Sequence, residues 1–414
     1  MTMRISCLSV SDQMGGSEVA LVGMISALGR VRPDWTFQVV LPGDGPLSQR
    51  VRDTGASCAI VRMPGPLARL GEWGAVDDAW SPSAQFALGV RLCESAAVLP
   101  GYESRLRRAL SAFQPDLIHT NGFKAHILGA RLKRRQQTLV WHLHEYVSRR
   151  RVSRWLLQRY ITRCDGVIAN SASVAADVTA SLTGMAPLHV VPNGIDLDAF
   201  APNGSRFDLD QVAGMPPAAA DVVRVGLIAT FGRWKGHDLF LDAVEQVASA
   251  RAVRGYIIGG PVYDTAHSQY TPRDLQAMIA ARQLEGRVGL TGFVDAASAM
   301  RALDIVVHAS TEAEPFGLVI AEAMACGRPV ITTGYGGAAE LVTPGHDAIV
   351  APPGDRNTLA EAIGRLADDR TLRETIGERA RESAVKRFAP ERMAAEIARA
   401  FEHAAERPAF ARTA

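Results

Sequence analysis

Two glutamates, Glu314 and Glu322, lie on either side of a short apolar run that opens with Pro-Phe-Gly. Residues 318–325 contain no polar side chain except Glu322, so the sequence predicts a helix that is buried on most sides. A buried carboxylate needs a partner, because otherwise its pKa rises and it becomes protonated. Two neighbouring hydroxyls of a sugar can be that partner, since one carboxylate accepts from both. Structural ion pairs with basic side chains would explain the same pattern.

The start of this expected helix is suited to a phosphate group. Pro315 is favoured in the first turn of a helix, and Gly317 lets a ligand approach the backbone closely. The free amides of a helix N-terminus bind phosphates. Together these residues fit a sugar nucleotide, with the phosphate at the helix start, Glu322 on the ribose and Glu314 on the donor sugar.

Positive charge for such a phosphate is available in the stretch ATFGRWKGHDLF, where Arg233 and Lys235 follow an expected strand. Their charges would stabilise a diphosphate as it leaves, although cations after strands are also common on protein surfaces. Near the N-terminus, Gly15 and Gly16 would let backbone amides approach a phosphate, and a plain tight turn explains them equally well. This turn is not GxGxxG, which disfavours a dinucleotide enzyme.

Polar residues also lie at the ends of expected strands in the first half of the chain. His144, in WHLHEY, would hydrogen bond a sugar or transfer a proton, and a structural histidine is equally consistent with the sequence. His119 and Asn121, in DLIHTNG, are candidates for contact with an acceptor. HExxH, GxSxG and a DxD pair in a strand context are absent, so the sequence predicts neither a metal site nor a serine hydrolase.

Strands and helices alternate through both halves, which predicts α/β domains with parallel sheets covered by helices on both faces. The expected strands are 4–10, 37–42, 58–63, 116–120, 138–144, 166–171, 223–230, 254–260, 288–293, 304–310, 328–334 and 347–353. The expected helices of the first half are 17–30, 103–113, 124–135 and 152–163.

The 414 residues exceed what one hydrophobic core usually organises, so two domains are expected. Residues 1–200 would form an acceptor-side Rossmann-like domain, and 201–220, rich in Pro, Gly and Ala, a linker. Residues 221–388 would form a nucleotide-sugar-binding Rossmann-like domain, and 389–414 a helix and tail returning toward the first domain. Ligands bind beyond the carboxyl ends of parallel strands, so a cleft between the two domains is the expected site.

Charge is balanced overall and uneven locally. The net charge of +2 does not indicate a nucleic-acid partner. Residues 131–163, however, contain ten Lys or Arg and one acid, Glu145. This stretch is either a solvated surface or a surface for an anionic membrane or acceptor, with Trp155, Leu156 and Leu157 as its apolar side.

The five cysteines are scattered and without CxxC spacing, as is typical of reduced thiols in a cytosolic protein. The N-terminal residues lack the apolar region of a signal peptide, and no stretch approaches the roughly 18 apolar residues of a membrane span. We therefore expect a cytoplasmic protein with at most peripheral contact at the inner face of a membrane.

The chain resembles the retaining glycosyltransferases of family 4. The resemblance runs almost end to end, from MGGSEVAL through VVPNGIDLDAF and TGFVDAASAM to GYGGAAELV. Its most specific part is EPFGLVIAEAMACGRPV, which matches the E-x7-E element of the family. It implies the GT-B fold, in which two Rossmann-like domains face across a cleft. It also implies transfer of a sugar from a nucleotide-diphosphate sugar to a hydroxyl of a glycan, lipid or small-molecule acceptor, with retention of configuration.

The resemblance assigns Glu314 to the donor sugar, Glu322 to the ribose, His144 to the reacting sugar, and Arg233 and Lys235 to the diphosphate. It implies no metal and no cofactor besides the nucleotide-sugar co-substrate. The other donor-binding residues that it implies are Gly15, Gly16, Phe293, Val294, Phe316, Gly317 and Leu318.

One departure from the family pattern concerns the two cations. The family usually has Gly-Arg, four residues and then Lys-Gly, whereas here only Trp234 separates Arg233 from Lys235. Lys235 carries over directly, and a neighbouring arginine is an alternative for the role of Arg233.

Other functions fit parts of the same pattern. GT-B epimerases and phosphorylases share the fold, and a non-catalytic nucleotide-sugar-binding scaffold would share the donor site. The segment 62–104, with Trp73, Trp80 and Tyr102, is expected to cap a lipid, a glycan or a small molecule.

Overall fold

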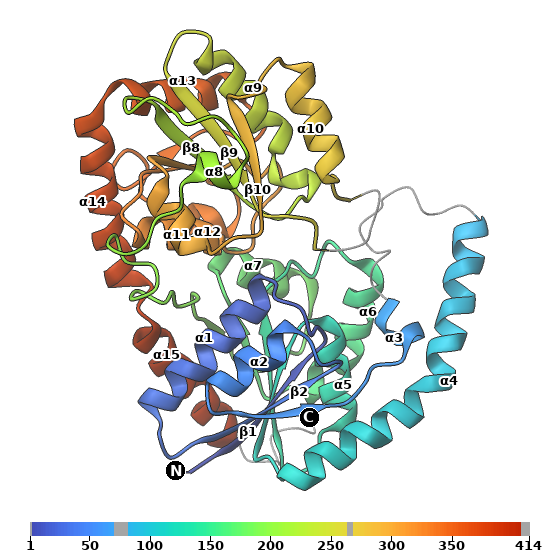
Figure 1. Ribbon diagram of the computed structural model, residues 1–414. Helices are drawn as coiled ribbons and strands as arrows, with labels where there is room; N and C mark the ends of the chain where they lie inside the picture. Colours follow the sequence, from blue (N-terminus) through green and yellow to red (C-terminus); the bar gives the residue numbers. More distant parts are fainter. Residues whose placement is uncertain (1, 70–81, 263–267, 407–414) are drawn as a thin grey trace. The chain divides into compact units, whose positions relative to one another are not determined.

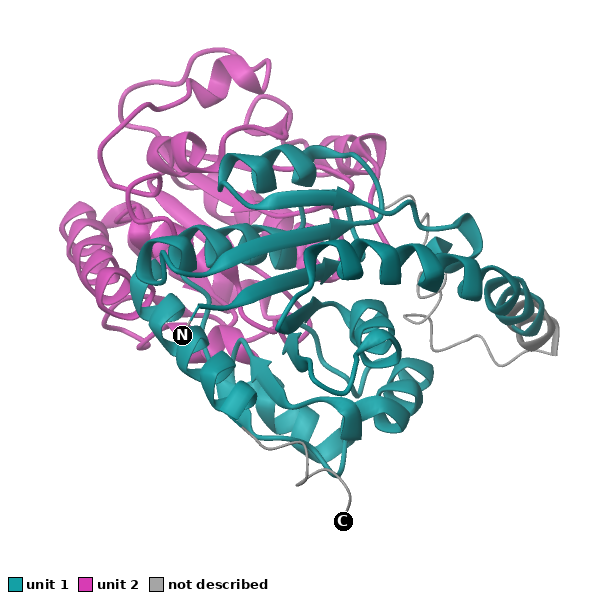
Figure 2. Cartoon of the chain, turned by 90° about the horizontal axis from the view of Figure 1, so that it is seen from below, with its two compact units in different colours: residues 1–194, 390–414 teal, residues 195–389 magenta. Residues whose placement is uncertain are grey.

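The computed structural model describes residues 2–69, 82–262 and 268–406. The chain divides into two compact units, coloured separately in Figure 2. Unit 1 comprises Met1–Gly194 and Pro390–Ala414, and unit 2 comprises Ile195–Ala389. The division after Gly194 lies before the expected end of the first domain at residue 200, and the expected linker 201–220 belongs to unit 2.

Charged side chains hold the segment 201–220 on unit 2. Arg301 donates to the carbonyl oxygens of Ala199 at 2.8 Å and Ser205 at 2.7 Å. The buried carboxylate of Asp210 accepts from the hydroxyl of Tyr256 at 2.7 Å. The composition of 201–220 indicated a linker. The contacts above instead hold its backbone on unit 2, because buried polar groups require hydrogen-bond partners.

Unit 1 contains a seven-stranded sheet in the order β3-β2-β1-β4-β5-β6-β7, and its paired strands are all parallel. Its strands are β1 Arg4–Ser9, β2 Thr36–Leu41, β3 Ser57–Ile60, β4 Leu117–Asn121, β5 Thr138–Leu143, β6 Gly166–Ala169 and β7 Leu188–Val190. Its helices are α1 Gly16–Val31, α2 Pro46–Asp53, α3 Gly65–Arg69, α4 Pro82–Phe113, α5 Phe123–Leu132, α6 Arg151–Tyr160, the 3-10 helix η1 Ile161–Arg163, α7 Ala172–Ser181 and α15 Pro390–Glu406. The predicted alternation is confirmed, while β7, α2, α3 and α7 were not predicted.

Helix α4 is longer than the predicted helix 103–113, because it continues through Pro100. A proline inside a helix removes one backbone hydrogen bond and bends the helix without always ending it. Figure 1 shows α4 changing direction along its length. The expected helix 103–113 is therefore the C-terminal part of a longer helix.

The core of unit 1 joins segments from both ends of the chain. Ile5 on β1 and Leu21 on α1 pack in one buried cluster with Ile397 and Phe401 on α15. The rings of Trp35 and Phe401 stack with centroids 6.2 Å apart. Each of these large side chains contributes about 2 kcal/mol by leaving water, so α15 is an integral part of unit 1.

Unit 2 contains a six-stranded parallel sheet in the order β10-β9-β8-β11-β12-β13. Its strands are β8 Val223–Ile228, β9 Val253–Ile258, β10 Val288–Gly292, β11 Ile305–His308, β12 Val330–Thr332 and β13 Ile349–Val350. Its helices are α8 Leu209–Val212, η2 Arg233–Lys235 (3-10), α9 His237–Ala248, α10 Pro272–Ala281, α11 Ala296–Ala302, α12 Leu318–Ala325, η3 Gly337–Leu341 (3-10), α13 Arg356–Asp368 and α14 Arg370–Arg387.

In both sheets the chain first builds strands outward in one direction and then starts on the other side. The direction changes between β1 and β4 in unit 1 and between β8 and β11 in unit 2. The loops after two such strands part to opposite faces of the sheet, and ligands of open α/β sheets bind at this point. The carboxyl ends of β8 and β11 are therefore the first place to examine in unit 2.

Helix α12 is buried on most sides, as the sequence predicted, with Ile320, Ala323 and Met324 fully enclosed in one core cluster. The helix begins at Leu318 with Gly317 as its N-cap, so Pro315 precedes it and is not in its first turn. Within the described ranges, no helix has the length and apolar character needed to cross a membrane.

Candidate functional site

The loops after β8 and β11 meet at the direction change of the unit 2 sheet. The backbone amide of Thr311, after β11, donates to the carbonyl oxygen of Trp234, after β8, at 2.8 Å. Beside this contact, the ammonium of Lys235 donates to Oε2 of Glu314 at 2.8 Å. The two residues that the sequence singled out in separate motifs, 79 positions apart, are thus an ion pair at the carboxyl edge of the sheet.

Gly236 makes this approach of the two loops possible. It has a φ of +77°, and a Cβ atom there would lie 2.0 Å from the carbonyl oxygen of Ala309. A side chain would therefore push the β11 loop away from Lys235 and strain the backbone as well. In the Lys235-Gly236 pair, the lysine carries the charge and the glycine leaves room for the loop after β11.

Three side chains hold the carboxylate of Glu314. Its Oε2 atom accepts from Lys235 and from Oγ of Ser310 at 3.1 Å, and it lies 3.3 Å from Nε2 of His308. Nδ1 of that histidine lies 3.1 Å from Oγ1 of Thr332 on β12. Because Ser310 also lies 3.0 Å from Nε2 of His308, the three groups form one network that fixes the orientation of Glu314.

The two glutamates have opposite electrostatic surroundings. Burial acts to raise the pKa of Glu314, but the charge of Lys235 and the hydrogen bond with His308 outweigh it and bring this pKa well below its ordinary value. Burial alone raises the pKa of Glu322 to about 7. Throughout the described part of the chain, no hydrogen bond or ion pair reaches the Glu322 carboxyl. A structural ion pair thus accounts for Glu314 and not for Glu322.

The start of α12 is buried at Gly317, and its first turn has no side-chain cap. Gly317 has a φ of +101°. Leu318 is half-buried and follows directly. Phe316 was expected at the donor, but its ring is buried and lies edge-on to Phe388 with centroids 6.1 Å apart. Its side chain belongs to the core because the turn before α12 directs it inward.

The remaining expected donor residues of unit 2 lie in different surroundings. The exposed guanidinium of Arg233 lies 4.5 Å from the ring centroid of Tyr270, in a cation–π contact. Phe293, directly after β10, is 66% exposed, and Val294 is half-buried. An exposed phenyl ring at a strand end is available for stacking on a planar ligand.

Four residues at this edge were missed in the sequence, namely Trp234, His308, Ser310 and Tyr335. The ammonium of Lys235 lies 3.9 Å from the centroid of the Trp234 ring, a cation–π contact that further fixes the lysine. Tyr335 is 49% exposed, and its carbonyl oxygen accepts from the amide of Glu314 at 3.1 Å. For His308 and Ser310 the available signal was DIVVHAS, in which one polar residue ends a buried strand and another follows it.

In unit 1 three histidine side chains lie close together at the carboxyl ends of β4 and β5. Nε2 of His119 lies 3.2 Å from Nδ1 of His142, whose ring centroid lies 4.1 Å from that of His144. Burial lowers the pKa of His119 to about 3 and that of His144 to about 4, and it also lowers the pKa of His142. All three rings are therefore neutral near pH 7.

The side chains of His119 and Asn121 lie inside unit 1. Both are fully buried, and the Asn121 amide donates to the carbonyl oxygen of Ser17 at 3.1 Å. Both residues lie toward the carboxyl end of β4, which ends at Asn121, and their contact with an acceptor stays a prediction. His144 is half-buried and directly follows β5.

Gly15 and Gly16 form the turn from β1 into α1, as the sequence predicted. Gly15 is the N-cap residue and supplies no side-chain cap, and Gly16 is exposed. In the same turn the sequence analysis missed Glu18, which is buried and accepts from the hydroxyl of Ser17 at 2.9 Å. Burial raises the pKa of this carboxyl.

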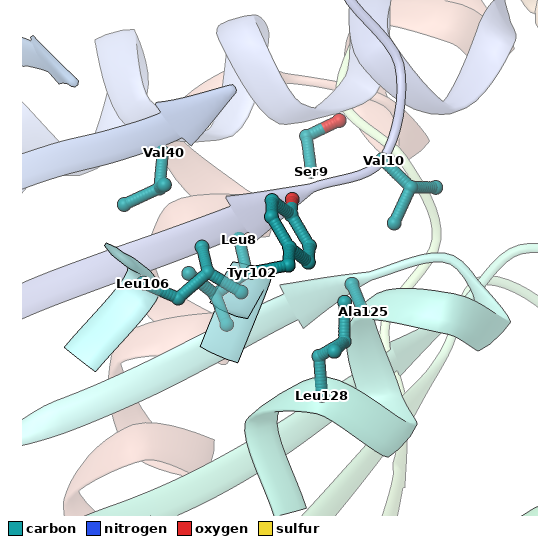
Figure 3. A pocket seen from close by; sticks show the side chains of 8 residues that line it. All are labelled: Leu8, Ser9, Val10, Val40, Tyr102, Leu106, Ala125 and Leu128. Carbon is teal, nitrogen blue, oxygen red and sulfur yellow. The ribbon is translucent and has the colours of Figure 1, made fainter. Parts of the chain in front are cut away.

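The segment 62–104 was expected to cap an acceptor through Trp73, Trp80 and Tyr102. Both tryptophans lie outside the described residues. Tyr102 is buried, and burial raises its pKa to about 12. Figure 3 shows it beside a small hollow between α4, α5 and the sheet, together with Leu8. Tyr102 is therefore a core residue of unit 1.

Among the residues with described positions, no group of three or more His, Cys, Asp or Glu side chains is arranged to hold a metal ion.

Two family models match separate parts of the chain. Residues 14–199 match the model described as Glycosyltransferase Family 4, and residues 220–369 match the model described as Glycosyl transferases group 1.

Relatives with named activities match in sequence. The lipopolysaccharide core biosynthesis mannosyltransferase LpsB of Rhizobium meliloti is 30% identical over 261 residues, which are 62% of this chain and 70% of that protein. The D-inositol 3-phosphate glycosyltransferase 1 of Catenulispora acidiphila is 32% identical over 220 residues. That match covers 50% of each protein, so the chain spans about half the length of this second relative.

Solved structures match over nearly the whole chain. Anabaena Alr3699/HepE in complex with UDP and glucose superposes with a TM-score of 0.76 at 26% identity, covering 96% of this chain and 98% of that one. The sucrose-phosphate synthase of Thermosynechococcus elongatus has a TM-score of 0.75 at 22% identity, covering 97% and 98%, and shows likeness of fold.

Proposed function

Because the chain belongs to the family 4 glycosyltransferases and has their GT-B fold, we propose that it transfers a hexosyl group from a nucleotide-diphosphate sugar to an acceptor hydroxyl. We propose further that transfer proceeds with retention of configuration and without a metal ion. The observation that carries the proposal is the edge of the unit 2 sheet. There an ionised Glu314, paired with Lys235, lies in the same turn-and-helix segment as a buried Glu322 that has no partner among the described residues.

Glu322 is the proposed ligand of the nucleotide ribose. Its carboxyl is removed from water, which raises its pKa to about 7. Near pH 7 it is therefore uncharged in a large share of molecules. Two ribose hydroxyls donating to it would stabilise the ionised form and lower that pKa. The binding of UDP and UDP-glucose by HepE, the solved relative at 26% identity, supports a donor of this class.

Lys235 is the proposed counter-charge of the departing diphosphate. In the proposed step the bond from the anomeric carbon to the diphosphate oxygen breaks. The acceptor oxygen forms its bond on the same face, and its proton passes to the diphosphate. The ammonium of Lys235 and the uncapped amides at the start of α12 would stabilise the negative charge that develops. Glu314 and Trp234 hold the lysine in position beforehand, and Arg233 adds an exposed charge nearby in the chain.

The other finer assignments come from the sequence. We propose that the neutral ring of His144 hydrogen bonds the reacting sugar. We propose that the acceptor is a sugar, a lipid-linked glycan or a small molecule. All five cysteines are free, which supports our proposal of a reducing, cytoplasmic compartment.

The proposal is tested first by thermal unfolding with UDP, GDP, ADP and TDP, using wild type, Glu322→Ala and Glu245→Ala. Glu245 is an exposed glutamate on α9 of the same unit and serves as the matched control. At about 100 times its Kd a nucleotide adds roughly 2.7 kcal/mol of stability, a shift of several degrees. We expect one nucleotide to stabilise wild type and the control, and to stabilise Glu322→Ala much less. Equal stabilisation of all three proteins would remove the ribose role, and no stabilisation by any nucleotide at millimolar concentration would contradict the donor class.

The matching nucleotide then selects the sugar donors for a transfer assay. Proton NMR of the glycosidic product reports the anomeric configuration, and assays with EDTA or with added Mg²⁺ and Mn²⁺ report the metal requirement. We expect an α-linked donor to give an α-linked product at the same rate with and without EDTA. An inverted product or a rate that depends on the added metal would overturn that part of the proposal.

A further inference from the structure

The basic stretch 131–163 divides into two parts with different roles in the structure. Arg131 forms an ion pair with Glu103, and Lys133 is buried and paired with Asp165. These two cations hold unit 1 together internally. The first part also contains the exposed Arg134 and Arg135, just after α5. The second part comprises α6 and the residues just before it, and its Arg154 and Arg159 are exposed.

Helix α6 exposes an unusual combination of side chains. Trp155 is 68% exposed and Val152 is 50% exposed, whereas Leu157 on the opposite side is buried. Arg154 and Arg159 are exposed as well. Residues three and four positions apart share one face of a helix, so Val152 and Arg159 lie on the same face as Trp155. The outward face of α6 therefore has an indole at its centre, with arginines around it.

No acid weakens this positive face from within the helix, since the sequence RVSRWLLQRY contains three arginines and neither Asp nor Glu. The nearest acid in the chain on the N-terminal side is Glu145, which is 3.2 Å from Arg150 and so is already paired. The surface is thus apolar and cationic at once. A partner that covers it must offer negative charge and a place for an indole side by side.

An anionic lipid bilayer has both properties at its surface. Guanidinium groups bind lipid phosphates, and tryptophan is favoured where headgroups meet acyl chains. Amphipathic helices with arginines on the polar side and Trp on the apolar side lie in this interface. A strand of nucleic acid would satisfy the arginines and could stack on Trp155, but it offers no apolar surface for Val152.

We propose that the outward face of α6, formed by Val152, Trp155, Arg154 and Arg159, docks this protein on the surface of an anionic membrane. The proposal does not depend on the donor site, because every residue in it belongs to unit 1 and none is assigned to catalysis or to nucleotide binding.

Vesicle sedimentation tests the proposal with the full chain, using vesicles of phosphatidylcholine alone and vesicles that also contain phosphatidylglycerol. We expect wild type to sediment with the anionic vesicles only, and less so as salt is raised, because salt screens exposed charges. An arginine near an anionic surface contributes roughly fivefold to binding, so Arg154→Glu/Arg159→Glu should weaken it at least about 30-fold. Trp155→Ala should weaken it about tenfold through loss of apolar contact.

Two control variants test whether vesicle binding depends on this face of α6 or on exposed charge and apolar surface elsewhere in the protein. Arg135→Glu changes an exposed arginine in the other part of the basic stretch, and Val385→Ala changes an exposed apolar residue of α14 in unit 2. Both should bind vesicles as wild type does, and unchanged melting curves show that each variant is folded. The proposal is overturned if wild type does not sediment with anionic vesicles at low salt. It is also overturned if the controls lose as much vesicle binding as the α6 variants, or if wild type binds single-stranded DNA and not vesicles.

Discussion

The carboxyl edges of the two sheets handle buried polar groups in opposite ways. In unit 1 the edge carries His119, His142 and His144, and burial among other imidazoles keeps all three neutral. In unit 2 the edge carries Glu314, which burial would also neutralise, but Lys235 lies within hydrogen-bonding distance and keeps it ionised. The sheets change strand direction in the same manner, so one well-placed counter-charge, and not the topology, accounts for the difference.

The largest expected effect comes from removing that counter-charge. Lys235→Ala should lower kcat about 100-fold, or roughly 3 kcal/mol, because a preorganised charge at the developing diphosphate is lost. Steady-state kinetics with the identified donor measures this. Lys386→Ala, at an exposed lysine of α14, is the control and should leave kcat unchanged. A Lys235→Ala enzyme with a wild-type kcat would show that the ion pair is structural.

Glu322 should give unit 2 a stability that falls as pH rises. Its folded pKa of about 7 lies above its unfolded value, so the native state holds the proton more tightly and loses this advantage between about pH 4.5 and 7. Glu322→Gln should therefore be more stable than wild type by roughly 2–3 kcal/mol at pH 8, and equal to it near pH 4.

Urea unfolding at both pH values checks this difference, with Glu245→Gln as the control. An equal stability gap at pH 4 and pH 8 would mean that lost packing, and not ionisation, causes it.

His144 should give unit 1 the opposite dependence. Its folded pKa of about 4 lies below the unfolded value, so the unfolded chain takes up the proton first and stability is lost as pH falls from about 6.5 to 4. His144→Gln should remove about 1–2 kcal/mol of this loss, since the ring is only half-buried. Melting temperatures across this range, with exposed His346→Gln as the control, report the effect. Parallel curves for wild type and His144→Gln would contradict it.

The smallest effect is expected from Ser310, which orients Glu314 without carrying charge. Ser310→Ala removes one hydrogen bond to the carboxylate and should cost about 1 kcal/mol, or roughly fivefold in kcat/KM. Ser249→Ala, at an exposed serine beside the end of α9, should have no effect. If Ser310→Ala equalled Lys235→Ala in its loss of rate, the serine would have to contact substrate directly.

The sequence predicted the features that depend on local pattern. Every expected strand coincides with a strand of the structure, because buried parallel strands read as continuous apolar runs. Glu314 and Lys235 were found because charge within or beside such runs is unusual.

What the sequence could not predict depends on contacts distant in the chain. Pro100 is tolerated inside α4, and Arg301 holds the segment that resembled a linker. His308 and Ser310 have a role only because folding brings Lys235 to Glu314. Phe316 shows the same limit, since nothing in Pro-Phe-Gly indicates whether its ring faces a ligand or the core.

The position of α15 in the chain has a consequence for biosynthesis. Its Ile397 and Phe401 complete the core of unit 1, yet the ribosome makes them after all of unit 2. Unit 2 is one continuous stretch and can close its own core first, although domains usually fold in the order of their synthesis. Until the last helix emerges, the apolar groove that receives it, lined by Leu28 and Trp35, stays exposed on the nascent chain. The half of the enzyme that is translated first is thus the half that matures last.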